Sequence, residues 1–350
     1  MSTSPSDTSS PESTWPAERA PVAILMVGST ITAIAAELAA EMGRYDEVLT
    51  IIRRGASTSL PEMPEGSELV DSMKHLKDFG ARPKVEACLK KITGIVGGRP
   101  FDCFIHHSTA IFSQVLTSHP LCRKYFYIEE GITAMLGGQF GRPKKRWLKS
   151  AVWSLRSWVF FGGRVDKYRP FFDIESPKYG GACAVTKPAF KGFPKRIQLP
   201  YERMEATVPV PAEIVIFLDS QYVQGSCSVD NYVTALTASL VALPGGKATA
   251  AIKFHPAEKD TARRQRIFDA IKAVANIASL VELPPEFSGE RMILDPSVKI
   301  VVGTSAAGFY IGERGFDAYT FAERITKMEP SFSKVFSSLP PSFLEVCRPI

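Results

Sequence analysis

The amino-acid sequence predicts an α/β protein made of two Rossmann-like domains. Apolar segments of strand length alternate with segments of helix length through both halves of the chain, a pattern typical of parallel, doubly wound sheets. With 350 residues the chain is longer than a single hydrophobic core usually serves. A proline-rich connection, "ERMEATVPVPA", separates the halves, and an apolar strand starts afresh after it.

The expected domain bounds follow from these changes of composition. We expect a disordered leader over residues 1–20, a first domain over residues 21–206 and a second domain over residues 207–350. The leader is rich in Ser, Thr and Pro and lacks the charged and apolar regions of a signal peptide. The last segment of the chain is expected to pack back against the first domain.

The first domain opens with a βαβ pattern over residues 22–54, in which an apolar strand, a Gly-Ser-Thr turn, an Ala-rich helix and a second apolar strand follow one another. The turn after its first strand contains one glycine, Gly28, and so does not form the G-x-G-x-x-G pattern of dinucleotide sites. The pattern then predicts a helix over 82–96, a strand over 101–107, a helix over 110–116 and a strand over 124–131.

The second domain repeats this alternation. Its loop of small residues, "GTSAAG", stands between a strand and a helix, where free backbone N–H groups and the helix dipole favour phosphate. The expected elements are a strand over 213–221, a helix over 229–242, a strand over 248–256, a helix over 259–275, and strands over 279–283 and 298–305.

Composition and charge restrict the class of partner. Hydrophobic residues make up 45% of the chain and charged residues 22%, as in soluble globular proteins. The net charge of +6 is too small to indicate a nucleic-acid partner, and the base-stacking motifs of RNA-binding proteins are absent. An anionic substrate or an acidic membrane surface fits this charge equally well.

The cysteines and the apolar runs indicate a location. The six cysteines show neither a C-x-x-C pattern nor metal-ligand spacing, so we expect reduced thiols in a cytoplasmic protein. No apolar run approaches the roughly 18 residues that a transmembrane helix needs.

A basic, tryptophan-rich segment covers residues 141–169. One face at helical spacing contains Trp147, Val152, Leu155 and Val159, and the basic residues ahead of it include Arg142, Lys144 and Lys145. Two functional interpretations are an interfacial helix on anionic lipid and a wall for an anionic acceptor. The alternative is a helix that packs on the core with its basic side in solvent.

Three short motifs stand in order along the chain: "EEG" at 129–131, "KFHP" at 253–256 and "GTS" at 303–305. With this set the chain resembles the bacterial sialyltransferases and polysialyltransferases, which carry an acidic-acidic-Gly motif, a His-Pro motif and a paired Ser/Thr motif in the same order. The resemblance implies a GT-B fold, in which two Rossmann-like domains face across a cleft. It also implies a CMP-sugar donor in the second domain, an acceptor in the first, and inversion without a required metal or other cofactor.

The resemblance implies roles for the first two motifs. A carboxylate suits removal of the acceptor hydroxyl's proton; this base is Glu129 or Glu130, and the resemblance favours Glu129. His255 is implied as the general acid at the departing CMP phosphate, since the pKa of histidine lies near working pH, and Pro256 fixes the backbone beside it. The alternatives are a solvated acidic strand end and a surface histidine.

Other residues are expected near the donor. Thr304 and Ser305, with Gly303, take the place of the paired hydroxyls that bind phosphate in the family, where Ser-Ser is common. Glu290 matches the acid that holds the ribose in relatives, although a surface glutamate is an equal alternative. By strand topology Lys253 and residues 219–221 face the same crevice.

Three polar residues in the first domain carry a weaker signal. His106, His107 and Ser108 follow a strand and could line the acceptor cleft. They lack the paired acid and the nucleophile elbow of a hydrolase triad.

We therefore expect an inverting glycosyltransferase that moves sialic acid or a related nonulosonic acid from a CMP donor to a neutral or anionic surface glycan, such as a capsular or lipo-oligosaccharide acceptor. The same chemistry with Kdo, legionaminic or pseudaminic acid is one alternative, and an NDP-sugar transferase is another. A non-catalytic glycan-binding protein on a degenerate transferase fold is the alternative from another class. A cytoplasmic enzyme with peripheral contact at the inner membrane surface is expected.

Overall fold

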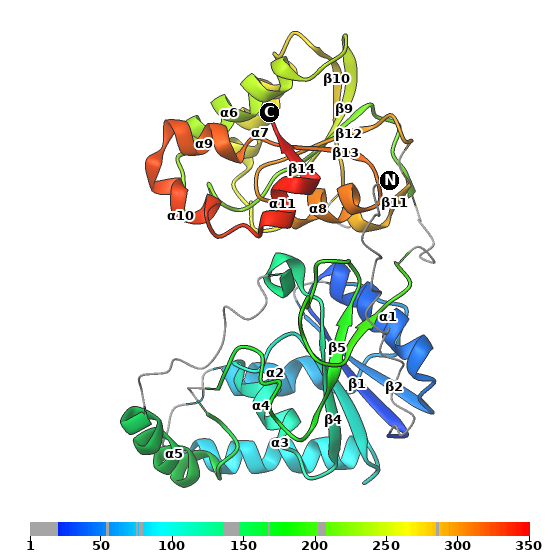
Figure 1. The fold of residues 1–350 in the computed structure, drawn as a ribbon, viewed down its shortest axis with the longest axis vertical. Coiled ribbons are helices and arrows are strands. Elements are labelled where there is room, and N and C mark those ends of the chain that lie inside the picture. The colour runs from blue at the N-terminus through cyan, green and yellow to red at the C-terminus, as the bar shows by residue number, and fades with distance from the viewer. Residues whose placement is uncertain are drawn as a thin grey trace, which may run out of the picture. The chain divides into compact units, whose positions relative to one another are not determined.

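The computed structural model describes residues 20–53, 56–74, 76, 80–135, 147–166, 169–201, 208–284, 287–293 and 295–350. The chain divides into two compact units, Met1–Glu202 and Arg203–Ile350. The change of composition along the sequence predicts this division between residues 206 and 207. Each unit contains a six-stranded sheet with helices around it (Figure 1).

The first sheet is parallel throughout, in the order β2-β1-β3-β4-β5-β6. Its strands are β1 (Val22–Val27), β2 (Glu47–Ile52), β3 (Phe101–Ile105), β4 (Cys122–Ile128), β5 (Tyr179–Ala184) and β6 (Arg196–Gln198). The helices of this unit are α1 (Thr30–Gly43), α2 (Gly66–Lys74), α3 (Ala81–Ile95), α4 (Ile111–Thr117), the 3-10 turn η1 (Gly131–Met135) and α5 (Trp147–Phe161). One face of the sheet shares a hydrophobic core with α2, α3 and α4, and α1 lies outside that core cluster.

The second sheet is also parallel, in the order β10-β9-β8-β12-β13-β14. Its strands are β8 (Ile214–Phe217), β9 (Ala248–Lys253), β10 (Ile277–Glu282), β12 (Lys299–Val302), β13 (Asp317–Thr320) and β14 (Cys347–Pro349). A separate two-stranded sheet pairs β7 (Val208–Pro209) with β11 (Met292–Ile293). The helices are α6 (Val229–Ala242), α7 (Thr261–Lys272), η4 (Gly289–Arg291), α8 (Ala306–Glu313), α9 (Ala322–Met328), η5 (Pro330–Phe332), α10 (Ser333–Phe336) and α11 (Pro341–Val346).

Both strand orders contain a switch point, where the chain reverses its direction of travel across the sheet. In the first sheet the reversal lies between β1 and β3, and in the second between β8 and β12. When the strands of the second sheet are numbered by their order along the chain, β8 being the first, they lie in the order 3-2-1-4-5-6. This is the order of Rossmann domains. In such sheets ligands bind outside the carboxyl ends of the strands at the switch point. The expected class, two Rossmann-like α/β domains, is confirmed.

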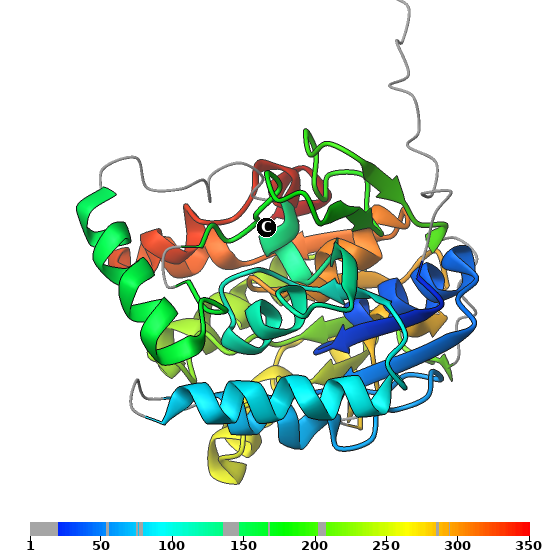
Figure 2. The ribbon, with the colours of Figure 1, turned by 90° about the horizontal axis from the view of Figure 1, so that it is seen from below.

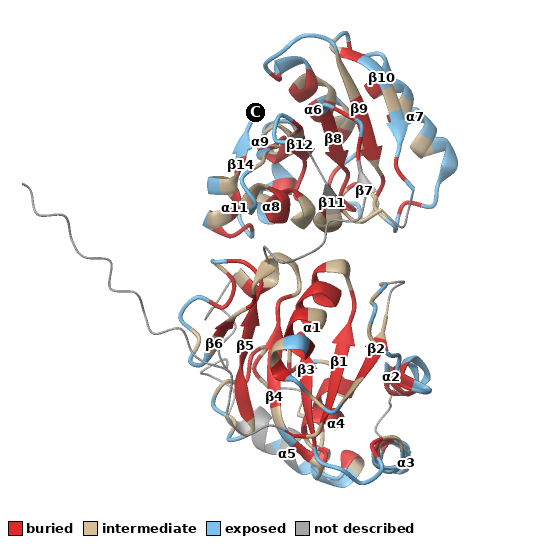
Figure 3. Ribbon diagram, turned by 90° about the vertical axis from the view of Figure 1, so that its right-hand side faces the viewer, coloured by how far each residue is buried: buried red, intermediate tan, exposed pale blue. Residues whose placement is uncertain are grey.

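The central strands have the apolar composition that a sheet covered on both faces requires. All six residues of β1 and all four of β8 are buried (Figure 3). After β1 the chain turns into α1 through a capping box: the Ser29 N–H donates to the Thr32 hydroxyl at 2.8 Å, and the Ser29 hydroxyl accepts from the Thr32 N–H. This cap fixes the turn in which Gly28 stands.

The C-terminal segment forms an edge of the second sheet, where β14 pairs with β13. Its expected packing against the first domain stays a prediction. The main-chain N–H of Ile350 donates to the carbonyl of Thr320, and the Arg324 guanidinium donates to the carbonyl of Ile350 at 2.7 Å. Hydrogen bonding of an edge strand therefore holds the segment within its own domain.

All six cysteines are buried and free. Burial raises the pKa of Cys88 to about 11 and the pKa of Cys347 to about 12, because a thiolate is poorly solvated in an apolar core. Across the parts of the chain described above, no helix is both long and apolar enough to cross a membrane.

Candidate active sites at the two switch points

The first switch point brings together Gly28 after β1, His106 after β3 and Glu130 after β4. His106 Nε2 lies 2.8 Å from the carbonyl oxygen of Met26, and its Nδ1 lies 3.4 Å from Glu130 Oε2. Because a carbonyl can only accept, Nε2 carries a proton and Nδ1 faces the carboxylate. The side chain of His106 is 8% exposed and that of Glu130 is 26% exposed. Glu130 is therefore a carboxylate with both a fixed partner and access to solvent.

Gly28 makes room for this pair. A Cβ atom at this position would lie 3.0 Å from His106 Cε1 and 3.5 Å from Glu130 Oε1. The glycine at the end of β1 thus serves close packing of the pair.

Glu129, the neighbouring acid, has a different environment. It is fully buried, and its Oε2 accepts from the backbone N–H of Val185 at 2.7 Å and of Thr186 at 2.9 Å. Its Oε1 accepts from the Thr186 hydroxyl at 2.8 Å. The side chain thus ties the end of β4 to the segment after β5. This geometry favours Glu130 over Glu129 as a group that reaches a substrate, the reverse of the preference that the sequence motif gave.

His107 and Ser108 do not join this pair. The His107 ring stacks on Phe171 at 4.6 Å between centroids and lies 2.9 Å from the Thr109 hydroxyl. The Ser108 hydroxyl is buried and hydrogen-bonds to the hydroxyl of Tyr127. Ser108 is therefore a packing residue without an exposed nucleophilic oxygen.

The second switch point is organised by Asp219, which follows β8. Its Oδ2 accepts from the backbone N–H of Thr304 at 2.6 Å and from the Thr304 hydroxyl at 3.1 Å, and its Oδ1 accepts from the N–H of Gln221 at 3.1 Å. A Cβ atom at Gly303 would lie 2.3 Å from Asp219 Oδ2, so glycine is required for this approach. Burial raises the pKa of Asp219, and the hydrogen bonds from Thr304 and Gln221 oppose that rise.

Thr304 and Ser305 therefore have unequal roles. Both polar groups of Thr304 donate to Asp219, so this residue fixes the loop. Ser305 is the N-cap residue of α8, but its side chain makes no capping hydrogen bond. A helix start without a side-chain cap offers N–H donors to an anion.

His255 follows β9, the strand next to β8. Its Nδ1 accepts from the backbone N–H of Ala257 at 3.1 Å, so the neutral ring carries its proton on Nε2. Burial lowers the pKa of His255, Asp219 acts to raise it, and the charge of Lys253 lowers it further. At neutral pH the imidazole is thus an uncharged donor through Nε2. Lys253 is the last residue of β9 and is half-buried, and Pro256 is exposed.

Glu290 lies near this loop through the packing of η4. A Cβ atom at Gly289 would lie 2.7 Å from the Phe217 ring and 3.3 Å from Ala307 Cβ, which places η4 against the end of β8 and the first turn of α8. Glu290 Oε2 accepts from the Ser288 hydroxyl at 2.8 Å. The structure therefore brings the expected donor residues of the second domain to one edge of its sheet.

The basic residues expected on the acceptor or membrane side are only partly visible. Arg142, Lys144 and Lys145 lie outside the described residues. Trp147 begins α5, and its side chain is also outside the described part. Among the residues that the structure does describe, no group of three or more His, Cys, Asp or Glu side chains could hold a metal ion.

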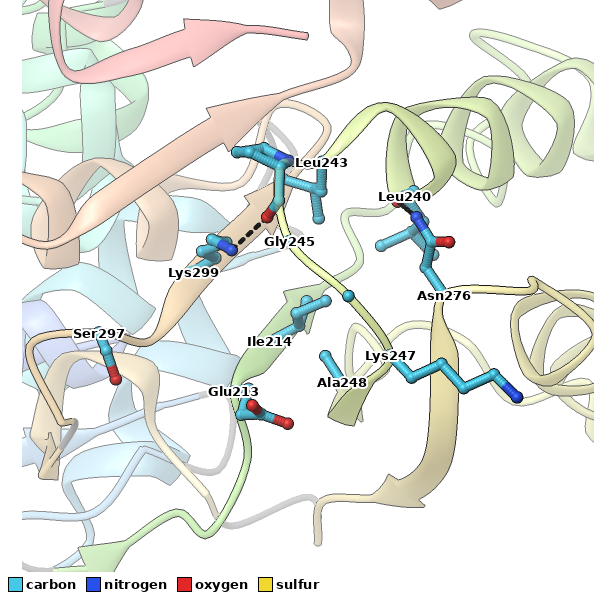
Figure 4. A pocket seen from close by; sticks show the side chains of 12 residues that line it. Glu213, Ile214, Leu240, Leu243, Gly245, Lys247, Ala248, Asn276, Ser297 and Lys299 are labelled. Atoms are coloured by element: carbon cyan, nitrogen blue, oxygen red, sulfur yellow. Dashed lines mark hydrogen bonds between the residues drawn. The ribbon is translucent and has the colours of Figure 1, made fainter.

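A cavity of about 230 Å³ lies at the opposite edge of the second sheet (Figure 4). Its lining includes Glu213, which precedes β8, and the first residues of three strands, Ile214, Ala248 and Lys299. The cavity therefore lies at the amino ends of the strands. The Lys299 ammonium donates to the carbonyl of Pro244. Because its main polar groups bond to the chain itself and it lies away from the carboxyl edge, we assign no substrate to this cavity.

Sequence reasoning identified the acidic pair and His255 but missed two residues that the structure connects to them. Asp219 was only one of several residues expected to face the crevice, and His106 was not paired with Glu130. Asp219 and His106 share one signal in the sequence, since each is a polar residue that follows shortly after an apolar strand. The partner of each, Glu130 or Thr304, lies further along the chain, after another strand.

Replacing Asp219 should release the "GTS" loop. Asp219→Ala leaves the two buried donors of Thr304 without an acceptor, so we expect a loss of about 2 kcal/mol in the free energy of unfolding of the second domain and weaker binding of nucleotide phosphates. Asp295→Ala is the matched control, because Asp295 is exposed and its carboxylate accepts from its near neighbour Ser297. Urea denaturation measures both; equal stability of the two variants would contradict a positioning role for Asp219.

Comparisons with known proteins give weak likenesses. No protein-family model matches the chain, and no curated protein matches it. Among solved structures, the S. aureus MnaA-UDP co-structure has a TM-score of 0.42 at 10% identity, covering 93% of this chain and 91% of that one. The UDP-GlcNAc 2-epimerase of Methanocaldococcus jannaschii has a TM-score of 0.42 at 9% identity, with 91% and 92% covered. Acinetobacter baumannii MurG has a TM-score of 0.39 at 12% identity, with 93% of each chain covered. Likeness at this level assigns no function to this chain.

Proposed function

We propose that the protein is a glycosyltransferase that uses a nucleotide-activated sugar. The observation that carries this proposal is the carboxyl edge of the second sheet. There the loop held by Asp219 leads into the uncapped start of α8, and the charge of Asp219 also acts on His255, which follows β9. Backbone N–H groups at a helix start and an imidazole N–H suit the phosphate of a nucleotide, which carries negative charge before and after the sugar leaves.

The first domain supplies the base in this proposal. Glu130 is the acid of the "EEG" motif that reaches solvent, and its side chain lies against His106. A carboxylate in this position takes the proton of an acceptor hydroxyl as the anomeric carbon is attacked. The motifs resemble those of GT-B transferases, in which one domain binds the acceptor and supplies the base and the other domain binds the donor.

The donor is proposed from the order of the three motifs. "EEG", "KFHP" and "GTS" resemble the motifs of sialyltransferases, so we propose CMP-sialic acid or another CMP-activated nonulosonic acid. His255 then donates from Nε2 to the CMP phosphate as it departs, and the uncapped N–H groups of α8 bind the same phosphate. Kdo, legionaminic and pseudaminic acid share this CMP chemistry. The proposed acceptor is a hydroxyl of a neutral or anionic glycan.

Thermal unfolding with CMP, UDP, GDP and ADP at equal concentration tests the donor. A ligand that binds only the folded state adds about 2.7 kcal/mol at a hundred times its Kd, so we expect CMP alone to raise the unfolding temperature. His255→Ala should reduce CMP affinity about tenfold, because one hydrogen bond to a charged phosphate contributes roughly 1.5 kcal/mol. His107→Ala is the control. His107 belongs to the first domain, where its ring stacks on Phe171, so this substitution should leave CMP affinity unchanged.

Each outcome discriminates between the alternatives. A shift with UDP or GDP and none with CMP would keep a nucleotide-sugar transferase and reject the sialyltransferase-like donor. No shift with any nucleotide, together with retained binding of a glycan, would favour the non-catalytic glycan-binding protein.

A further inference from the structure

Helix α5 exposes an apolar face. Among the described residues, the large hydrophobic side chains that are exposed are Val152, Leu155, Trp158, Val159, Val241, Val281 and Met328. The first four belong to α5, with exposed fractions of 70%, 66%, 68% and 44%. They stand at spacings of three and four residues, so they form one stripe. The other three are scattered over separate elements.

The opposite side of α5 holds the helix on its domain. Ser157 and Phe161 are buried, and Phe160 packs against the hydrophobic core. The Ser157 hydroxyl donates to the carbonyl of Val165. Figures 1 and 2 both show α5 at the margin of its domain, next to α3. The buried side of α5 already packs on the core of its domain. Within the described residues, the exposed stripe is therefore not the face by which α5 packs on that core.

The sequence segment that contains this stripe carries charge of one sign. Between Gly131 and Val165 the sequence contains no Asp or Glu. The same stretch contains seven basic residues, Arg142, Lys144, Lys145, Arg146, Lys149, Arg156 and Arg164. Arg156 lies on α5 and is exposed. A helix with an aliphatic and tryptophan face in a purely basic segment is typical of attachment to anionic bilayers.

We propose that α5 docks the first domain on an anionic lipid surface. Val152, Leu155, Trp158 and Val159 enter the boundary between headgroups and acyl chains, and Arg156 on the same helix contacts lipid phosphates. A second copy of the chain fits less well, because a symmetric pair would place two such basic segments against each other. Nucleic acid fits less well because three of the four stripe residues, Val152, Leu155 and Val159, are aliphatic and offer no stacking surface to bases. The inference stands independently of the proposed sugar transfer.

Vesicle co-sedimentation of the full chain tests the docking. We expect binding to vesicles that contain phosphatidylglycerol, little binding to vesicles of phosphatidylcholine alone, and weaker binding as ionic strength rises. The variant Leu155→Ser/Trp158→Ser/Val159→Ser should bind at least tenfold more weakly. Because these side chains are exposed, its unfolding temperature should equal that of the unchanged protein. Val241→Ser/Val281→Ser is the matched control, with exposed apolar residues removed from the other domain.

Three results would overturn the proposal. The first is equal binding of the unchanged protein to both kinds of vesicle, and the second is unchanged binding of the α5 variant. The third comes from light scattering: a dimer that the α5 variant converts to a monomer, without any vesicle binding, would assign the stripe to a second copy of the chain.

Discussion

Replacing Glu130 by Gln is expected to lower sugar transfer by about 10²- to 10⁴-fold, the usual contribution of a general base. The carboxylate lies at the first switch point, partly exposed, with Nδ1 of His106 at 3.4 Å. Gln keeps the size of the side chain but cannot take a proton. The unfolding temperature should stay close to that of the unchanged protein, because Gln keeps the size and polarity of this partly exposed side chain.

A transfer assay with CMP-sialic acid and a glycan acceptor, read by mass spectrometry, measures this loss. Glu175→Gln is the control, since Glu175 is an exposed acid of the same domain. Full activity of Glu130→Gln would remove this residue from the chemistry. If Glu129→Gln lost activity at unchanged stability while Glu130→Gln kept it, the motif's first acid would be the base after all.

Glu129→Ala should have the largest effect on stability. The substitution removes the acceptor of two buried backbone N–H groups and one hydroxyl. Each unsatisfied buried donor costs about 1–3 kcal/mol, so we expect a loss of at least about 3 kcal/mol in the free energy of unfolding of the first domain. Glu129→Gln retains one carbonyl oxygen as an acceptor and should lose less.

Hydrogen exchange locates the effect. The amides of Val185 and Thr186 should exchange faster in Glu129→Ala, while the amides of β8 in the second domain should keep their rates. Unchanged exchange at Val185 and Thr186, with an unchanged unfolding transition, would show that the carboxylate does not hold the segment after β5.

The strongly patterned elements could be predicted from the sequence. β1, β3 and β8 are apolar runs whose side chains are buried on both faces, and the helix expected over residues 229–242 matches α6. The missed elements lack such a pattern. β14 has three residues and contains Pro349, so pairing with β13 rather than local preference makes it a strand.

The candidate sites were predictable only in part, for a related reason. Glu130 and His255 stand at strand ends within short motifs, so the sequence indicates them. The hydrogen bond from Thr304 to Asp219 joins residues 85 positions apart, and it exists only because β8 and β12 are neighbours. Likewise, helical spacing indicated the apolar stripe of α5, but not that it faces outward, since that depends on which side contacts α3.

The buried cysteines have a consequence for oxidative chemistry. Thiolates, not thiols, react with peroxides and alkylating agents, and burial raises the pKa of Cys88 to about 11, of Cys227 to about 12 and of Cys347 to about 12. These three thiols are thus both shielded and protonated in the folded chain, and their modification requires a domain to open. Cys88 belongs to the first domain, and Cys227 and Cys347 belong to the second. Labelling of each thiol therefore reports the opening of its own domain. Mass spectrometry of labelled peptides can therefore time the unfolding of one domain separately from the other.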